Sequence, residues 1–262
     1  MTSTIPVADF LFAARRDARP IAMDADVATL DLAEAYAIQD RLVALGIAAG
    51  ARVVGWKIGL TSSAAMAAFG ASEPIVGRLF EEYLLTSGAL LDLARTCDAK
   101  VEGEVLIELR EVPSPPFDDE RILSAIASVR PAIEIADSRI VGWPKNAALA
   151  IADDACCGWV IVGEPRQLAG LDLANVEMRF TVDGVEVGRG TGADCLGSPI
   201  NVLRWFLSKA VEMDWRIQPG HLILTGAIAS PVHADCGIHH RASLTMLGPV
   251  EFALSENQFV RR

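Results

Sequence analysis

The nine-residue run from Val101 to Leu109 constrains the fold more than any other stretch of this 262-residue chain. Its odd positions are Val, Gly, Val, Ile and Leu, and glutamates stand at positions 102, 104 and 108. The alternation predicts a β-strand, in which side chains two residues apart project from the same face. Glu102 and Glu104 would then lie about 7 Å apart along the strand. Gly103 would leave room between them for a ligand or another backbone.

This pair of glutamates has two interpretations. Two carboxylates at that separation suit a hard divalent cation. They also suit the solvent-exposed face of a half-buried strand, with Glu108 continuing that face. Spacing alone favours solvent, because charged side chains are seldom buried.

Two more charged residues interrupt apolar, strand-like sequence. Glu134 lies between Ile133 and Ile135, and it is either paired or metal-bound in the interior or turned outward on an edge strand. Lys57 precedes a glycine turn, where its ammonium is either buried and functional or extended to water. Further along, Asp137 and Arg139 are expected to form an ordinary ion pair.

The remaining pattern predicts an α+β fold. Residues 1 to about 50 are expected to be helical, with Asp31 and Glu34 forming a capping box at a helix start. Two further helices are predicted at 119–128 and 199–213. Strands are predicted at 52–59, 101–109, 158–163, 177–182, 221–225 and 243–252. The order shows no regular βαβ alternation, which disfavours a doubly wound sheet.

Composition narrows the function classes. The chain is 52% hydrophobic, which suffices for one large domain with a smaller N-terminal elaboration. Acidic residues outnumber basic ones by 34 to 23, so nucleic acid and anionic membranes are not expected partners. No apolar stretch approaches membrane-spanning length. The five cysteines form no C-x-x-C pair and are expected to be reduced, which favours a cytoplasmic protein.

Two other kinds of site are disfavoured. The late group His233, Cys236, His239 and His240 does not have the spacing of a standard zinc motif. All four histidines follow residue 220 and no G-x-S-x-G elbow accompanies them, which argues against a Ser-His-Asp hydrolase. Residues 190–199 are rich in glycine and precede a helix, where backbone N–H groups can meet a carboxylate, but they lack a phosphate-loop pattern.

Taken together, the motifs resemble the 2-keto-4-pentenoate hydratase and 4-oxalocrotonate decarboxylase group of the fumarylacetoacetate hydrolase superfamily. The resemblance runs in order from about residue 30 to the C-terminus. Its segments are GWKIGLTS (55–62), VEGEV (101–105), PAIEIADSRI (131–140), GTGADCLGSPIN (190–201), QPGHLILTGA (218–227) and LGPVEF (247–252).

The resemblance implies a mixed β-roll core, with residues 1–80 mainly helical and residues 81–262 forming the catalytic domain. It implies Mg²⁺ or Mn²⁺ held by Glu102, Glu104 and Glu134, and Lys57 as the catalytic residue of the substrate pocket. Other substrate-binding residues implied by the matching segments are Leu60, Thr61, Ser62, Asp154 and Thr225. Such proteins are also expected to form homo-oligomers and, in some cases, a complex with a neighbouring pathway enzyme.

The implied activity is hydration of 2-hydroxypenta-2,4-dienoate to 4-hydroxy-2-oxopentanoate in aromatic meta-cleavage catabolism, with the metal stabilising the enolate. Three departures keep alternatives open. Ile75 stands where related hydratases carry an acid, a form closer to the 4-oxalocrotonate decarboxylases. The usual A-D-N-A-S reads Ala-Asp-Asp-Ala-Cys at 152–156, and Ser198 replaces a histidine. A non-catalytic homologue is the third alternative, whereas a C–C hydrolase would need an early histidine that this chain lacks.

Overall fold

The computed structural model describes residues 4–23 and 30–255. Its helices are α1 (Thr4–Asp17), α2 (Leu32–Ala48), α3 (Ser63–Phe69), α4 (Asp119–Ala125), α5 (Ala147–Ala152) and α6 (Pro199–Glu212). Its strands are β1 (Val53–Gly59), β2 (Ile75–Phe80), β3 (Leu84–Thr86), β4 (Ala89–Leu91), β5 (Ala99–Leu109), β6 (Ile126–Asp137), β7 (Trp159–Val162), β8 (Glu177–Val182), β9 (Val185–Thr191), β10 (Leu222–Ala227), β11 (Val232–His233), β12 (His239–Leu244) and β13 (Gly248–Leu254). Short 3₁₀ turns include η2 (Glu81–Tyr83), η3 (Leu93–Arg95), η4 (Asp154–Cys156) and η6 (Gly192–Asp194).

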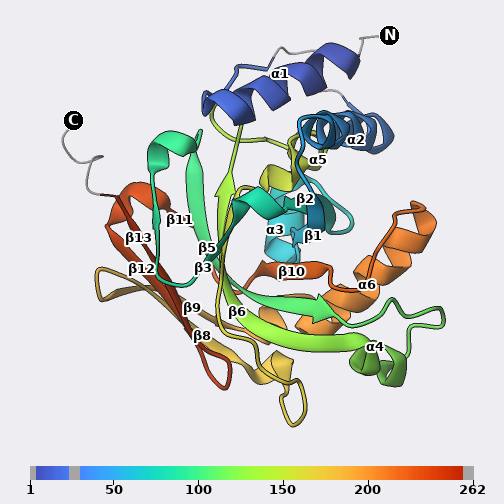
Figure 1. The fold of residues 1–262 in the computed structure, drawn as a ribbon, viewed down its shortest axis with the longest axis vertical. Coiled ribbons are helices and arrows are strands. Elements are labelled where there is room, and N and C mark those ends of the chain that lie inside the picture. The colour runs from blue at the N-terminus through green and yellow to red at the C-terminus, as the bar shows by residue number, and fades with distance from the viewer. Residues whose placement is uncertain (1–3, 24–29, 256–262) are drawn as a thin grey trace.

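A large mixed sheet forms the centre of the molecule. Its strand order is β2-β1-β10-β5-β6-β7-β3, and β11 pairs with one end of β5. The two longest strands, β5 and β6, run antiparallel at its middle, and β1 pairs in parallel with β10. Figure 1 shows this sheet curling, with α6 and α4 on one side and the N-terminal helices on another.

A second sheet closes the interior against the first. Its strand order is β4-β13-β12-β8-β9. Side chains of both sheets and of α6 share one hydrophobic core, which includes Ile107, Ile133, Phe180, Phe206 and Phe252. A separate core joins α1, α2 and α5. The predicted α+β fold with a β-roll core and N-terminal helices is therefore confirmed.

Most predicted elements lie where the pattern placed them. Asp31 accepts the Glu34 amide and the Glu34 side chain accepts the Asp31 amide, as the capping box predicts. The predicted strand 243–252 is wrong as a single element, because Thr245 to Leu247 form a turn between β12 and β13. The predicted helix 119–128 ends at Ala125, where the chain enters β6 directly.

The boundary expected at residue 80 stays a prediction. Strands β1 and β2 precede it but pair with the rest of the large sheet, whereas α1 and α2 pack outside that sheet. Among residues 4–23 and 30–255, none of the helices combines the length and apolar character needed to cross a membrane.

Candidate active site

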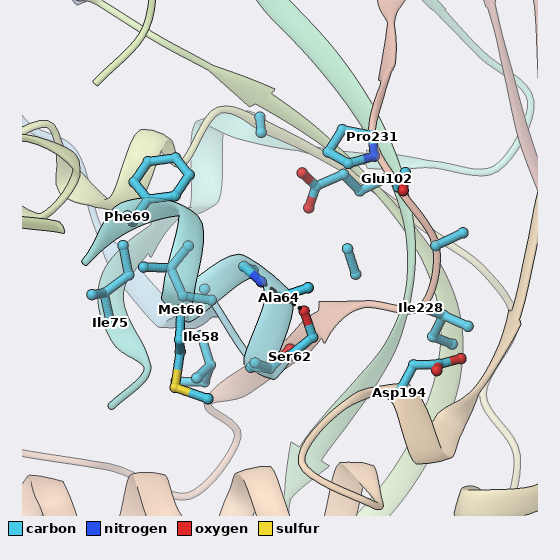
Figure 2. Close-up of a pocket in the computed structure, with 18 of the residues that line it drawn as sticks. Ile58, Ser62, Ala64, Met66, Phe69, Ile75, Glu102, Asp194, Ile228 and Pro231 are labelled. Carbon is cyan, nitrogen blue, oxygen red and sulfur yellow. Dashed lines mark hydrogen bonds between the residues drawn. The ribbon is translucent and has the colours of Figure 1, made fainter. Parts of the chain in front are cut away.

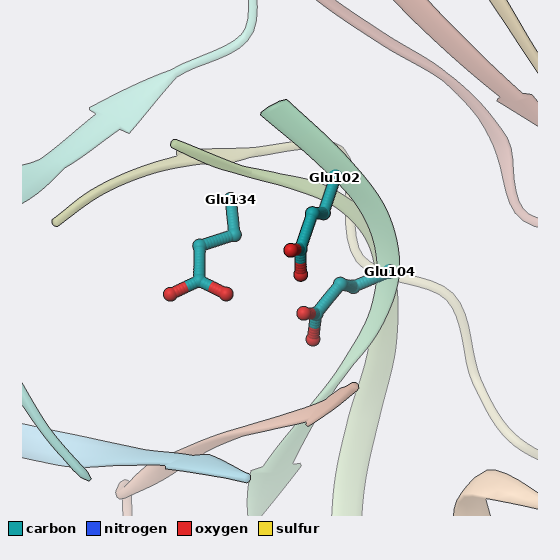
Figure 3. Close-up of side chains that lie close together, drawn as sticks. All are labelled: Glu102, Glu104 and Glu134. Atoms are coloured by element: carbon teal, nitrogen blue, oxygen red, sulfur yellow. The ribbon is translucent and has the colours of Figure 1, made fainter. Parts of the chain in front are cut away.

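Three glutamates from the two central strands converge on one point. Glu102 on β5 stands directly opposite Glu134 on β6 in the strand register, and Glu104 follows on β5. Each of the three offers a carboxylate oxygen, and these oxygens all lie within 4.8 Å of one another. Figure 3 shows the three side chains pointing into the same space on the concave side of the strands. We call Glu102, Glu104 and Glu134 the carboxylate trio.

The trio is buried and short of hydrogen-bond donors. Glu104 and Glu134 are fully buried, and Glu102 is partly exposed. One oxygen of Glu104 accepts the Gly226 amide at 2.8 Å. Its other oxygen and both oxygens of Glu134 have no hydrogen-bond partner in the part of the chain that the structure describes. Buried polar atoms are normally paired, so these oxygens are able to accept a further ligand.

Lys57 of β1 lies against the interior of the trio. Its Nζ lies 3.3 Å from Glu134 Oε2 and donates a hydrogen bond to the Ala155 carbonyl at 2.9 Å. The side chain is 6% exposed, so the buried interpretation of Lys57 is correct and extension to water is wrong. One ammonium cannot balance three carboxylates.

The electrostatics of the trio reflect this imbalance. Burial, followed by the charges of Glu134 and Glu102, raises the pKa of Glu104 well above its usual range. Burial raises the pKa of Glu134 to about 7, with Lys57 opposing the shift. Burial works to lower the pKa of Lys57, but the three carboxylates outweigh it and raise that pKa instead. Without a metal ion, the three carboxylates therefore hold Lys57 as an ammonium.

The donor set matches a hard divalent cation. Carboxylate oxygens are the preferred ligands of Mg²⁺ and Mn²⁺, and a 2+ charge would offset the repulsion that raises the carboxylate pKa values. The unpartnered oxygens of Glu104 and Glu134 would gain a partner at the same point. The residues present therefore fit such an ion.

A cleft of about 960 Å³ opens beside Lys57 and Glu102. Leu60 to Met66, at the end of β1 and the start of α3, line one side, and Ile228 to Pro231 line another. Figure 2 shows Glu102 facing this space across from Ser62 and the α3 helix, with Asp194 at its lower edge. Its volume lies in the usual range for small-molecule sites.

The predicted substrate-binding residues other than Lys57 divide into two groups. Leu60, Thr61 and Ser62 line the cleft, and Ser62 also caps α3 by accepting the Ala65 amide. Thr225 and Asp154 do not line it. The Thr225 hydroxyl donates to the Val105 carbonyl inside the sheet, so it faces away.

The Asp154 side chain also points away from the cleft and forms hydrogen bonds inside the protein. Its carboxylate is fully buried and accepts hydrogen bonds from the Arg78 amide and from Arg15 on α1. Asp154 therefore stays a predicted substrate residue that does not line the cleft. Its neighbours Ala155 and Cys156 line the cleft instead.

Several cleft residues were not predicted from the sequence. Lys100 lies on β5 two residues before Glu102, and its Nζ stands 3.9 Å from the centre of the Trp143 ring. Alternation along β5 places Lys100 on the face of Glu102, so this residue was detectable. Trp143 and Arg189 come from a loop and the second sheet, and no local pattern indicated them, whereas Asp194 lies in the glycine-rich segment 190–199.

Ile75, the first residue of β2, is 4% exposed and lines the cleft. Its side chain packs beside Gly59, where a β-carbon would come within 3.2 Å of it. The position at which related hydratases carry an acid is thus an apolar wall in this protein.

Two expectations about the glutamate strand need correction. The solvent-exposed interpretation is wrong for Glu104, which is fully buried next to β10, whereas Glu102 is partly exposed at the cleft. Gly103 faces the second sheet rather than a ligand, since a β-carbon there would meet Met178 at 3.0 Å.

The expected ion pair between Asp137 and Arg139 is absent. Arg139 pairs with Asp153 at 2.6 Å, and its contact with Asp137 is to the backbone carbonyl. In the late histidine group, His240 Nε2 contacts the Ala234 and Gly237 carbonyls. In the described residues the trio is the sole group of three or more potential metal ligands.

Comparison with known proteins places these features in a family. The fumarylacetoacetate (FAA) hydrolase C-terminal family model matches residues 73–254. 2-Keto-4-pentenoate hydratase 1 of Dechloromonas aromatica (strain RCB) is 35% identical over 253 residues, covering 95% of this chain and 96% of that protein. A 4-oxalocrotonate decarboxylase of a Pseudomonas species is 36% identical over 220 residues, covering 84% and 86%.

A solved structure agrees with the same grouping. The 4-oxalocrotonate decarboxylase of Pseudomonas putida G7, complexed with magnesium and adipate, superposes with a TM-score of 0.91. It is 26% identical, and the match covers 96% of this chain and 97% of that one. Sequence family, curated relatives and fold all agree that this chain belongs to the fumarylacetoacetate hydrolase family.

Proposed function

We propose that this protein is a metal-dependent lyase that adds water to 2-hydroxypenta-2,4-dienoate and releases 4-hydroxy-2-oxopentanoate. The observation that carries the proposal is the carboxylate trio with its unpartnered oxygens, held beside a buried ammonium at a cleft. Its relatives named 2-keto-4-pentenoate hydratase support the substrate class.

Glu102, Glu104 and Glu134 would hold Mg²⁺ or Mn²⁺. When bound, the ion supplies Lewis-acid stabilisation of negative charge on the 2-oxygen of a 2-oxo acid. Magnesium in the decarboxylase of P. putida G7 supports this assignment. Glu104 is additionally fixed by the Gly226 amide, which orients its carboxylate before any ligand arrives.

Lys57 is the residue that we propose touches the substrate. Its ammonium lies at the cleft beside Glu134, where it can bind and orient the substrate's carboxylate or 2-oxygen. Its contact with the Ala155 carbonyl limits where the ammonium can lie. Leu60, Thr61 and Ser62 would form the wall against the rest of the substrate.

The second candidate is a 4-oxalocrotonate decarboxylase using the same residues. The observation that favours it is Ile75, which places an apolar side chain where a hydratase needs an acid for proton transfer. Loss of CO₂ requires charge stabilisation at the 2-oxygen but no activated water. The 36% identical relative of that name supports this candidate.

The two candidates separate in one experiment. The purified protein, loaded with Mg²⁺ or Mn²⁺, is incubated with 2-hydroxypenta-2,4-dienoate and, separately, with 2-oxohex-3-enedioate. We expect the dienol absorbance to fall while 4-hydroxy-2-oxopentanoate accumulates. Release of CO₂ from the second compound would instead assign the decarboxylase. Turnover of neither compound by metal-loaded protein would refute both and leave the non-catalytic homologue.

Homo-oligomerisation, a complex with a neighbouring pathway enzyme and a cytoplasmic location are further parts of this proposal. They rest on the family resemblance of the sequence. Size-exclusion chromatography with light scattering tests the first of them.

A further inference from the structure

A second cavity, of about 510 Å³, shares no lining residue with the cleft. The ends of α1 and α2 form one side of it. The other side is formed by the segment from β2 to η2, by η3 and by the start of β7. We call it the arginine cavity. Its lining includes three arginines, Arg15, Arg16 and Arg95, and the aromatic residues Phe80, Tyr83 and Trp159.

One arginine of this cavity remains able to bind an anion. Its lining holds three arginines and two acidic residues, Asp17 and Glu82, and Arg15 is already paired with the buried Asp154. Arg16 is paired with Asp17 at 2.8 Å. Arg95 forms none of the ion pairs found within residues 4–23 and 30–255, and it is exposed at the cavity. A guanidinium without a carboxylate partner is the part of this wall that can bind an incoming carboxylate in bidentate fashion.

Its apolar walls are aromatic. The Arg95 guanidinium lies 4.3 Å from the Trp159 ring centre, and Tyr83 packs edge-on against Trp159 at 4.9 Å. Arg15 lies 5.5 Å from the Phe80 ring centre. Alternating guanidinium and aromatic groups favour a flat ligand, which can stack on either kind of surface.

Size and charge together select one class of ligand. The volume suits a small molecule and is too small for a polypeptide segment with its side chains. Asp17 and Glu82 oppose a ligand with several negative charges, such as a nucleotide. A flat molecule with a single carboxylate fits both constraints.

Arg15 also connects this cavity to the candidate active site. Its Nη2 donates to Asp154 at 2.9 Å and to the Cys157 carbonyl at 3.1 Å. Asp154 begins a turn in which three consecutive residues, 154 to 156, have φ values of 52°, 51° and 55°. Left-handed residues other than glycine cost about 1–2 kcal/mol each, so this turn depends on the contacts that hold it.

The turn bears directly on Lys57. The carbonyl that accepts the Lys57 ammonium belongs to Ala155, the central residue of the turn. The same arginine side chain therefore lines the arginine cavity and braces the turn that positions Lys57. A ligand that draws on the Arg15 guanidinium must alter the support of this turn.

We propose that the arginine cavity is a second ligand site for small aromatic monocarboxylates, and that Arg15 transmits its occupancy to the Lys57 turn through Asp154. The assignment does not depend on which reaction the cleft performs.

Binding is tested with benzoate as the probe, by isothermal titration of the full chain. Cyclohexanecarboxylate keeps the charge without the aromatic ring, and benzyl alcohol keeps the ring without the charge. We expect both to bind at least about tenfold more weakly than benzoate, because each loses one of the two recognition elements. Equal binding of all three would overturn the ligand class.

Variants locate the site. Arg95→Met is expected to weaken benzoate binding at least about tenfold, whereas Arg110→Met, at an exposed arginine outside the cavity, leaves it unchanged. Lys57→Met is also expected to retain benzoate binding. Loss of binding in Lys57→Met, or full binding in Arg95→Met, would place benzoate in the cleft and overturn the proposal.

The connection is tested by hydrogen exchange. Saturating benzoate is expected to change the exchange rate of amides in residues 153–157 several-fold in the wild type but not in Asp154→Asn. Arg15→Lys, which keeps a cation but loses the two-pronged contact, serves as the second variant if Asp154→Asn does not fold. Unchanged exchange in the wild type, with benzoate bound, would overturn the transmission through Arg15.

Discussion

Two buried ionic clusters contact the turn at residues 153–157, and they differ in how their charges are satisfied. In the carboxylate trio, Lys57 forms an ion pair with Glu134, and three buried oxygens of Glu104 and Glu134 have no hydrogen-bond partner among the described residues. In the other cluster, which we call the arginine–aspartate cluster, Arg139 and Arg15 face Asp153 and Asp154.

The arginine–aspartate cluster is fully engaged. Arg139 is 1% exposed and contacts both oxygens of Asp153 through its Nε and backbone amide. Its remaining nitrogens donate to the carbonyls of Asp137, Cys157 and Asp153. Buried charges whose hydrogen bonds are all made serve to fix structure, here the turn that holds Lys57. Buried carboxylates whose oxygens are unpartnered fit a ligand that the protein binds.

The largest expected effect is a loss of folding stability when the arginine–aspartate cluster, but not the carboxylate trio, loses a charge. Arg139→Met leaves Asp153 buried without a counter-charge, so we expect the free energy of unfolding to fall by about 3–5 kcal/mol. Urea denaturation measures this. Glu104→Gln in metal-free protein is the matched variant and should cost far less, because it removes one of several like charges. Similar losses of unfolding free energy in both variants would show that the two clusters do not differ in their contribution to stability.

Metal ions should affect only the trio. Mn²⁺ at about 100 times its dissociation constant is expected to raise the free energy of unfolding by about 2.7 kcal/mol, since it binds the folded chain alone. The same Mn²⁺ concentration should leave the unfolding midpoint of Glu104→Gln nearly unchanged. Stabilisation of both proteins by the same amount would place the ion elsewhere.

The pH dependence of stability provides a third test. Burial raises the pKa of Glu134 from 4.5 to about 7. Between these values the folded chain keeps a proton that the unfolded chain releases, so the stability of metal-free protein falls as pH rises. We expect a loss of about 2 kcal/mol between pH 4.5 and 7, relative to Glu134→Gln. Parallel profiles for the two proteins, measured by urea denaturation, would contradict the buried charge.

The smallest effect is expected at a third carboxylate on the same strand. Glu108 of β5 is partly exposed and accepts hydrogen bonds from Ser128 and Arg130. Pairs of this kind contribute up to about 1 kcal/mol, so Glu108→Gln should change the free energy of unfolding by no more than that. A larger loss would show that exposure does not separate structural from ligand-binding carboxylates on β5.

Much of the site was predictable because strand alternation is a local property. It correctly grouped Glu102 with Glu104 on one face of β5, and it placed Glu134 and Lys57 within strands. Burial was not predictable, because it depends on the curl of the sheet and on β10 lying beside β5. The pairing of Glu102 with Glu134 is a matter of register between strands, which neither strand encodes alone.

The turn at residues 153–157 was also only partly predictable from the sequence. Its sequence motif indicated a functional segment, and the structure places this segment at the cleft. The motif did not reveal that the Asp154 side chain points away while the Ala155 carbonyl faces Lys57. That difference arises from left-handed backbone at residues 154–156, which is held by α1 and Arg139 from distant parts of the chain.

The central claim, that the trio is a divalent metal site, is tested most directly by Mn²⁺ titration followed by electron paramagnetic resonance. Wild type, Glu104→Gln and Glu108→Gln are compared at neutral pH. We predict tight binding of a single ion in wild type and Glu108→Gln, and at least about 100-fold weaker binding in Glu104→Gln, because a ligand and its charge are both lost. Unchanged Mn²⁺ affinity in Glu104→Gln would contradict the claim.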